Sequence, residues 1–354
     1  MSNRISFNII LSLISLISFS VSGQPVREIR DSVGFCWYSN EMDSFITWLE
    51  NNKITSEKFE SENLFAAISP HDDYLYAGRV YYPIYKLIKA KEIIIFGVTH
   101  GTVRKAINDP QNILILDEFK FWKGPYGNVS ISDLREEIKS GLDTNYYKVS
   151  NYAHSLEHSI EAVIPFLQYY NREIKITPVM VTRMSFERMD TVSKAMAEII
   201  FHYMKAKNLK LGEDILILIS NDANHYGEDF NNYPYGLDEY AHDKATEEDR
   251  KIADKLNDEI SSAKISDLAK ELWPETNYRN VYPIWCGRYP IISGLLTAKH
   301  LAEMSGKTLI GKLFCYSDTF SEKALLFKET RMGLTAPFSL RHWVGFFSAG
   351  FYLR

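Results

Sequence analysis

Short apolar runs without polar alternation recur along this chain and constrain its fold more than any other feature. Such runs are typical of strands buried on both faces of a sheet. Several of the segments between them have apolar residues at helical spacing, and helices between strands favour parallel pairing through right-handed crossovers. The sequence therefore predicts an α/β fold, with a central, largely parallel or mixed sheet flanked by helices. The expected strands are 65–69, 93–97, 113–116, 174–181 and 214–220, and the expected helices are 40–51, 80–90, 132–141, 158–170, 185–205 and 291–301.

The chain shows no sign of division into separate domains. Its 354 residues are 45% hydrophobic, which is enough for a packed core and excludes bulk disorder. No internal repeat, low-complexity tract or long Pro/Gly/Ser-rich linker interrupts the pattern. We therefore expect a single domain over residues 24–354, in which the acidic segment 228–249 is a surface loop with solvated charges.

Residues 1–23 have the arrangement of a secretory signal peptide. Arg4 precedes a nearly uncharged apolar run over 5–19, and small residues lead up to Gly23. The run is shorter than the roughly 20 residues of a spanning helix, and no later run is long enough. We expect cleavage after Gly23, export to the periplasm or the extracellular space, and no membrane attachment of the mature chain. An uncleaved N-terminal anchor is the alternative.

The charge balance bears on the class of binding partner. Lys and Arg number 40 against 45 Asp and Glu, a formal net charge of -5. This balance argues against a nucleic acid held by a basic surface, and a small molecule or a peptide is the expected ligand.

Three of the apolar runs lead into loops that carry a histidine. His71, His100 and His225 each lie within six residues of the end of such a run. Ligands of open parallel sheets bind at the carboxyl ends of the strands, so the three imidazoles would converge if the strands are neighbours. A single histidine after a strand is most simply a hydrogen-bonding group. Neutral imidazoles gathered with acidic residues, however, are usual donors of a transition-metal site.

A fourth candidate is Cys286, which lies just before the expected helix 291–301 and close to Arg288. A helix N-terminus and a nearby cation both lower the pKa of a thiol and favour the thiolate, which binds metals. The alternative is a buried, inert cysteine. That interpretation is favoured for Cys36 and Cys315, and three cysteines allow at most one disulfide.

The expected helix 158–170 is preceded by a second group of titratable residues. His154, His158 and Glu161 would share one face if the helix already begins at His154, which would form a metal-binding pair of histidines. Alternatively, Ser155 caps the helix and His158 has a structural role. Glu157 and His158 could also orient a metal-bound imidazole from behind.

Five ordered motif blocks resemble those of one protein family. The blocks are Pro70-His71 with Tyr74 and Gly78, Gly97-Val98-Thr99-His100, Glu157-His158-Ser159-Ile160-Glu161 with Pro165-Phe166, Ser220-Asn221-Asp222 with His225-Tyr226-Gly227, and Cys286-Gly287-Arg288-Tyr289-Pro290-Ile291. In this order they are similar to the Memo family, also named AmmeMemoRadiSam system protein B, which is structurally related to the class III extradiol dioxygenases. The resemblance extends over roughly residues 34–353.

The resemblance implies an extradiol dioxygenase-like fold and a metal pocket. Its two histidines and one cysteine correspond to His71, His100 and Cys286, and Asp222 and His225 match further pocket-lining positions. The implied cofactor is an iron or copper ion, with zinc as an alternative. Because a thiolate stands where the related dioxygenases use a carboxylate, dioxygenase chemistry does not transfer directly.

The chain departs from the family pattern at two motif positions. Asp72 and Asp73 occupy the usual Ala-Gly positions after the first histidine, and they add negative charge beside the expected ligand. Gly101 stands where a second histidine usually follows His100, and His225 is expected to take over that role. An exported member is also unusual for the family.

The leading hypothesis is a secreted, metal-binding redox protein. In it His225 acts as general acid/base or fourth ligand, and Asp222 orients an imidazole. One alternative is a zinc-dependent N-deacetylase in which His71 and Asp73 bind zinc with His154 or His158. The other is a non-catalytic binding protein whose aromatic residues line a recognition groove. Those residues are Tyr74, Tyr76, Trp122, Tyr126, Trp285 and Tyr289.

Overall fold

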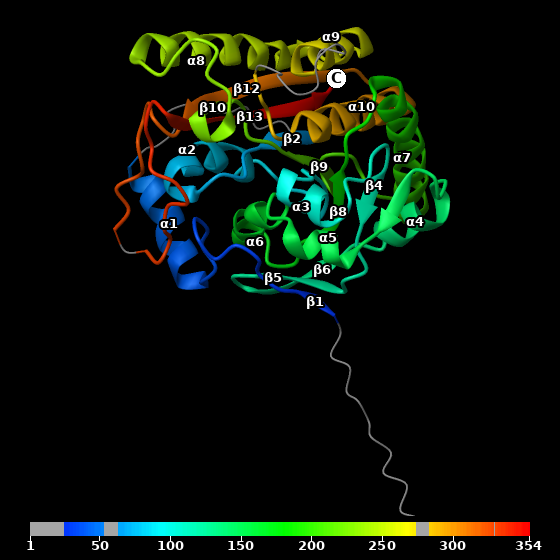
Figure 1. The fold of residues 1–354 in the computed structure, drawn as a ribbon. Helices are drawn as coiled ribbons and strands as arrows, with labels where there is room; N and C mark the ends of the chain where they lie inside the picture. Colours follow the sequence, from blue (N-terminus) through cyan, green and yellow to red (C-terminus); the bar gives the residue numbers. More distant parts are fainter. Residues whose placement is uncertain (1–24, 53–62, 274–282, 329) are drawn as a thin grey trace, which may run out of the picture.

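The computed structural model describes residues 25–52, 63–273, 283–328 and 330–354. In this part of the chain a mixed β-sheet runs through the middle of the molecule and helices cover both of its faces (Figure 1). The expected signal peptide lies outside the described residues, so its prediction stays open.

The sheet follows the order β1-β5-β6-β8-β3-β9-β2-β13-β12-β11, with β4 between β7 and β8 and with β10 against β13. The strands β6, β8, β3, β9 and β2 are parallel, and β13 then pairs antiparallel with β2. The strands are β1 (Val26–Arg27), β2 (Ala66–Ser69), β3 (Glu92–Gly97), β4 (Leu114–Leu116), β5 (Phe121–Gly124), β6 (Gly127–Ile131), β7 (Tyr147–Val149), β8 (Lys175–Val181), β9 (Ile215–Ser220), β10 (His225–Gly227), β11 (Asp258–Glu259), β12 (Leu309–Asp318) and β13 (His342–Leu353).

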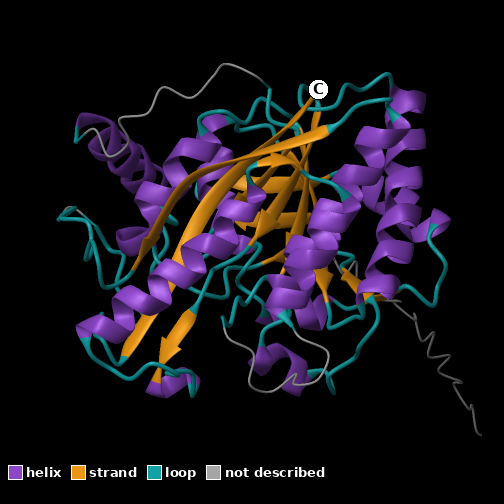
Figure 2. Ribbon diagram, turned by 90° about the horizontal axis from the view of Figure 1, so that it is seen from above, coloured by secondary structure: helices purple, strands orange, loops and turns teal. Residues whose placement is uncertain are grey.

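Helices α4, α7, α9 and α10 contribute to the core on one face of the sheet, and α1, α2 and α6 to the core on the other. The view from above shows the strands fanned out between these helices (Figure 2). The helices are α1 (Ser39–Asn51), α2 (Tyr74–Tyr85), α3 (Gly101–Ala106), α4 (Leu134–Gly141), α5 (Asn151–Leu156), α6 (Ile164–Tyr170), α7 (Phe186–Lys207), α8 (Glu239–Ala253), α9 (Ser262–Leu272) and α10 (Arg288–Met304), with short 3-10 turns η1 (Glu161–Val163), η2 (Glu228–Phe230) and η3 (Asp254–Leu256).

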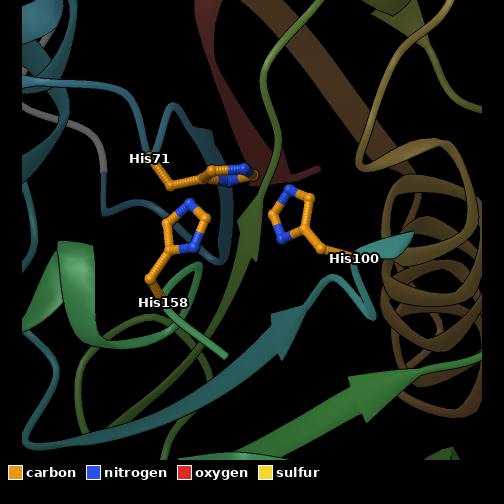
Figure 3. Close-up of side chains that lie close together, drawn as sticks. All are labelled: His71, His100 and His158. Carbon is orange, nitrogen blue, oxygen red and sulfur yellow. The ribbon is translucent and has the colours of Figure 1, made fainter. Parts of the chain in front are cut away.

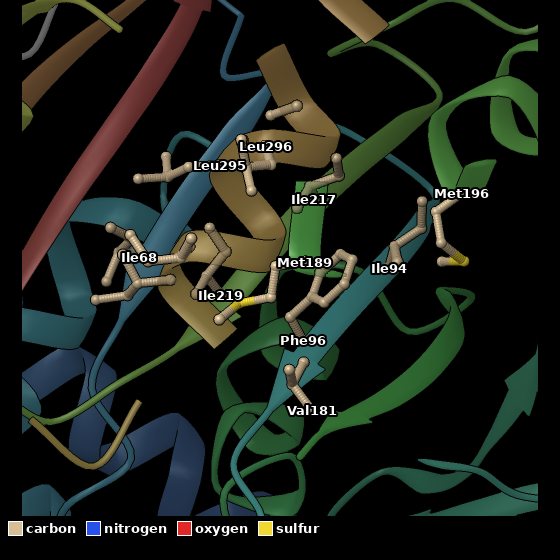
Figure 4. Close-up of a cluster of buried hydrophobic side chains, with 14 of the residues drawn as sticks. Ile68, Ile94, Phe96, Val181, Met189, Met196, Ile217, Ile219, Leu295 and Leu296 are labelled. Atoms are coloured by element: carbon tan, nitrogen blue, oxygen red, sulfur yellow. The ribbon is translucent and has the colours of Figure 1, made fainter. Parts of the chain in front are cut away.

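The central strands supply apolar side chains to both cores because successive residues of a strand point to opposite faces. On β9, Ile217 and Ile219 belong to the α7/α10 side, whereas Leu216 and Leu218 belong to the other side. Figure 4 shows the α7/α10 side, where Met189 packs with these isoleucines. Uninterrupted apolar runs are therefore the sequence signature of strands buried on both faces, as predicted.

The α/β prediction is confirmed, but three expected elements are wrong. The helix expected over 80–90 is α2, which begins at Tyr74 and ends at Tyr85. The helix expected over 158–170 is broken into η1 and α6, with α5 ending before it. The acidic segment 228–249 is not simply a loop, since it contains η2 and most of α8.

Among the described residues, no helix has both the length and the apolar character that crossing a bilayer requires.

Candidate metal centre

The candidate centre lies at the carboxyl ends of three adjacent strands, β3, β9 and β2. His100 follows β3 and is the residue before α3, Asp222 follows β9, and His71 follows β2. Because these strands are parallel neighbours, their carboxyl ends bring the three loops together at one edge of the sheet.

The hydrogen bonds of His71 determine which of its ring nitrogens is available. Ser220 Oγ donates its only proton to the Ser159 carbonyl at 2.7 Å, so it accepts from His71 Nδ1, 2.8 Å away. The lone pair of His71 therefore lies on Nε2. Burial, followed by the nearby His100 and His158, holds the pKa of His71 well below its usual value, so the ring is neutral and able to bind a metal.

Glu157 plays the corresponding role for His100. Its Oε1 lies 2.7 Å from His100 Nδ1, and its Oε2 accepts the His100 backbone N–H at 3.0 Å. The Glu157 side chain is 1% exposed. Burial raises its pKa, but the charge and hydrogen bonds of His100 outweigh burial and hold it well below the usual value. Burial lowers the pKa of His100, but the Glu157 charge and hydrogen bond outweigh burial and raise it above its usual value. The neutral ring therefore has its lone pair on Nε2, and metal binding would displace the Nε2 proton of the charged ring.

Cys286 reaches this edge from the loop before α10. Its Sγ lies 3.2 Å from His71 Nε2 and accepts the Asp222 N–H at 3.3 Å. The loop packs closely because the next residue is Gly287, where a Cβ would lie 2.5 Å from Asn221 Oδ1. The expected lowering of the thiol pKa is wrong for the metal-free protein. Burial and then the Asp222 charge raise it well above its usual value and outweigh Arg288.

Asp222 contacts His71 through both carboxylate oxygens. Oδ1 accepts the His71 backbone N–H at 2.9 Å, and Oδ2 lies 3.3 Å from His71 Nε2. Burial raises the pKa of Asp222 to about 7, so this carboxyl group can take up or release a proton near neutral pH. The sequence suggested that Asp222 orients an imidazole. In the structure it can also exchange a proton beside His71.

The described residues form two donor groups that share His71. One consists of His71, His100 and His158, and the other of His71, Asp222 and Cys286, and the donor atoms of each group lie within 4.8 Å of one another. Figure 3 shows the three imidazoles meeting from separate loops. Bonds of 2.0 to 2.3 Å in a tetrahedral site separate donor atoms by about 3.3 to 3.8 Å. Cys286 Sγ and Asp222 Oδ2 lie 3.2 and 3.3 Å from His71 Nε2, which is close to the separation of donor atoms in such a site.

His225 lies near the centre but belongs to neither donor group. Its Nδ1 lies 3.0 Å from the Ala223 carbonyl, and its ring packs edge-on against Phe230 at 4.9 Å. Burial lowers its pKa to about 4, so the ring is neutral and Nδ1 donates to the carbonyl. The third imidazole of the centre is that of His158, whose ring stacks on that of His100 with centroids 4.7 Å apart.

The expected pair of His154 and His158 on one helix face does not form. His154 is buried in α5, and its Nε2 lies 2.9 Å from the Ile115 carbonyl, whereas His158 lies beyond the end of that helix. The interruption has a local cause, because Glu157 Oε1 accepts the backbone N–H groups of His158 and Ser159. These donors cannot then point along a continuous helix.

The zinc pair proposed for a deacetylase is not formed either. Asp73 Oδ2 accepts the backbone N–H of Thr335 at 2.6 Å, and Asp73 belongs to neither donor group of the described residues. Asp72 lies close enough to Asp222 for the Asp222 charge to add to burial in raising the pKa of Asp72.

The aromatic residues proposed to line a recognition groove are mostly core residues. Tyr74 and Trp285 are fully buried, and Tyr126 is the one member of the set that is partly exposed. The buried members are Tyr74, Tyr76, Trp122, Trp285 and Tyr289.

Comparison with known proteins identifies the family. A family model described as Memo-like protein matches residues 32–318. A MEMO1 family protein of Aquifex aeolicus is 31% identical over 245 residues, covering 68% of this chain and 75% of the relative. This chain belongs to the Memo family.

Two further Memo relatives match over shorter stretches. A MEMO1 family protein of Nitrosopumilus maritimus is 29% identical over 201 residues, covering 53% of this chain and 64% of the relative. One of Pyrobaculum arsenaticum is 31% identical over 173 residues, covering 47% and 54%. The chain therefore spans less than two thirds of the length of these two relatives.

Two features of this Memo centre were missed or misassigned from sequence. Ser220, which sets the tautomer of His71, was not singled out, although a polar residue ending an apolar strand is a signal for it. The role of the missing second histidine was given to His225, whereas the structure places His158 in the donor group with His71 and His100.

Proposed function

We propose that this protein is an exported, metal-dependent oxidoreductase of the Memo family. In this proposal His71 Nε2, His100 Nε2 and Cys286 Sγ hold one iron or copper ion. Asp222 and His158 complete the surroundings of the ion, and His225 serves as the nearby acid/base.

One observation carries the proposal. Ser220 and Glu157 hold Nδ1 of the two imidazoles, so Nε2 is the nitrogen that each ring can offer to a metal, in His100 after release of the Nε2 proton of the charged ring. A structural histidine does not need both of its nitrogens arranged in this way, whereas a metal ligand does.

The donor types favour a redox-active transition metal. Thiolate and imidazole donors select copper, zinc or iron over magnesium and calcium, and a bound copper or iron ion supplies one-electron chemistry or polarises a substrate oxygen. Asp222 can hold or release a proton at Oδ2, and neutral His225 can accept one at Nε2.

The test is the metal content of protein purified without chelators. The wild type is expected to carry stoichiometric iron or copper, and His71→Ala/Cys286→Ala is expected to lose it. A matched control is His202→Ala/Cys315→Ala, which removes an exposed histidine and a cysteine of β12 outside both donor groups. Unchanged metal content in a folded His71→Ala/Cys286→Ala protein would refute the assignment.

Export is tested separately by expressing the full chain in a Gram-negative host and fractionating the cells. We expect periplasmic protein whose N-terminal residue is Gln24, because the apolar run and small-residue exit suit cleavage after Gly23. Full-length protein confined to the cytoplasm would contradict export.

A further inference from the structure

Three arginines lie at the same edge of the sheet as the candidate metal centre. Arg104 is one helical turn after His100 in α3, and Arg288 opens α10 two residues after Cys286. Arg183 follows β8, the parallel neighbour of β3. Arg104 lies within electrostatic reach of both other arginines, since the charges of Arg183 and Arg288 add to burial in lowering its pKa.

Few negatively charged groups lie close to these three arginines in the described part of the chain. There, the one carboxylate within 4.0 Å of any of the three is that of Asp109, whose Oδ1 lies 3.7 Å from Arg104 Nε and whose side chain is 43% exposed. Three partly buried arginine side chains are thus accompanied by one carboxylate, which is itself partly exposed. Such an arrangement favours an anion from outside the chain.

Most of the guanidinium donors are also unused. Arg288 donates from Nη1 to the Trp285 carbonyl at 2.9 Å, but its buried Nε has no acceptor among the described residues. The guanidinium of Arg183 makes no side-chain hydrogen bond or ion pair to any residue in that same part of the chain. Each guanidinium offers five N–H donors in a planar fork that matches a carboxylate or phosphate group.

Arg183 also lines a cavity of about 360 Å³ beside α7 and α9. Asn112 and Ser185 supply polar groups to its wall, and Phe186 and Trp273 supply apolar surface. The volume lies in the range of small-molecule sites, which combine apolar walls with a few polar groups. Arg183 thus belongs both to the arginine cluster and to the wall of a cavity of small-molecule size, which also carries the charges of Lys270 and Glu187.

We infer that Arg104, Arg183 and Arg288 bind the oxyanion, a carboxylate or a phosphate, of a small organic substrate of this protein. The arginines hold the anionic group, and their position beside His100 and Cys286 directs the remainder of the molecule to the donor groups. Only this last part rests on the proposed function, because anion binding by the arginines does not require a metal.

The test uses three probes of similar size: benzoate, phenyl phosphate and uncharged benzamide. Binding to the full mature chain is measured by calorimetry, before and after metal removal with a chelator. We expect at least one anion to bind tenfold or more tightly than benzamide in both states, and the better anion distinguishes carboxylate from phosphate recognition.

Variants assign this binding to the arginines. Arg183→Gln removes a guanidinium that holds no described structural contact, so it should fold normally and weaken anion binding about tenfold, with metal content unchanged. Arg288→Lys, which keeps the charge but loses the fork, should weaken binding less than Arg288→Gln does. The control is Arg172→Gln, an arginine of the α6 end that is 44% exposed and pairs with Asp43; it should bind as the wild type does.

Two results would overturn the inference. One is that neither anion binds better than benzamide, and the other is that the preference survives in Arg104→Gln/Arg183→Gln. An anion preference that depends on the arginines in protein without any metal would support the inference while refuting the proposed metal function, so the two failures are distinguishable.

Discussion

At the scale of single residues, the candidate centre depends on groups that touch its ligands from behind. Ser220 and Glu157 determine which nitrogen of His71 and His100 faces the centre. Neither residue needs to contact a metal, but each sets the tautomer and the orientation of a ring. Such partners commonly change metal affinity nearly as strongly as the ligands themselves.

Glu157→Gln should therefore lower metal affinity by about 10- to 100-fold, because the amide no longer accepts from His100 Nδ1 with an ionised oxygen. Affinity is measured by competition with a chromogenic chelator. Glu118→Gln is the control, since its side chain is 58% exposed and pairs with Lys139. Equal affinities for the two variants would show that Glu157 has only a structural role.

At the scale of elements, α8 holds together the loops that carry the centre. Asp249 of α8 is fully buried and accepts hydrogen bonds from the Trp285 ring N–H, from the Tyr316 hydroxyl at 2.6 Å and from the Asn224 backbone at 3.2 Å. Trp285 precedes Cys286, and Asn224 precedes His225. One carboxylate thus connects both loops to β12.

Asp249→Asn should lower the free energy of unfolding by about 1 to 3 kcal/mol at pH 5, because an amide cannot satisfy all three donors. Burial raises the pKa of Asp249 to about 6 in the folded protein, well above the usual value of an aspartate. The folded state therefore binds this proton more tightly than the unfolded state does. The stability that results is complete below about pH 4 and is lost as the pH rises through 6.

The corresponding measurement is urea unfolding of wild type and variant at pH 5 and pH 7.5. The wild-type advantage is expected to shrink at the higher pH. An advantage that grows with pH would contradict the protonation argument.

At the scale of the whole molecule, the N-terminal strand β1 supports the loop that carries Glu157 and His158. Arg27 of β1 is 2% exposed, forms a buried ion pair with Glu161 and donates from Nε to the His154 carbonyl at 3.1 Å. These partners are more than 120 residues away in sequence. The start of the expected mature chain is therefore part of the support of the centre.

Arg27→Met should destabilise the fold by about 3 to 5 kcal/mol, because it leaves the Glu161 carboxylate buried without its partner. Arg27→Met/Glu161→Gln should recover part of this loss, since the second change removes the unpaired charge. Thermal and urea unfolding compare the two variants with the wild type. A double variant no more stable than Arg27→Met would exclude the ion pair as the cause.

Much of the fold could be predicted because buried strands have a local signature. The interiors of the runs that became β2, β3 and β9 are apolar throughout, and β8 departs from this pattern only at the buried Thr177. β13 was not predicted as a strand, although it pairs with both β2 and β12. Its 12 residues include Gly345 and Gly350, and its place is determined by pairing with strands far away in sequence.

By itself, the sequence determined the α/β class, the family, and the strand ends at which polar side chains gather, because apolar periodicity and motif order are properties of neighbouring residues. Only the tertiary structure decided that His158 joins His71 and His100, that the Cys286 thiol is protonated without a metal, and that Asp249 and Arg27 hold the surrounding loops. The reason is physical: desolvation, tautomer and buried charge depend on partners brought together by folding, and residue spacing along the chain does not encode them.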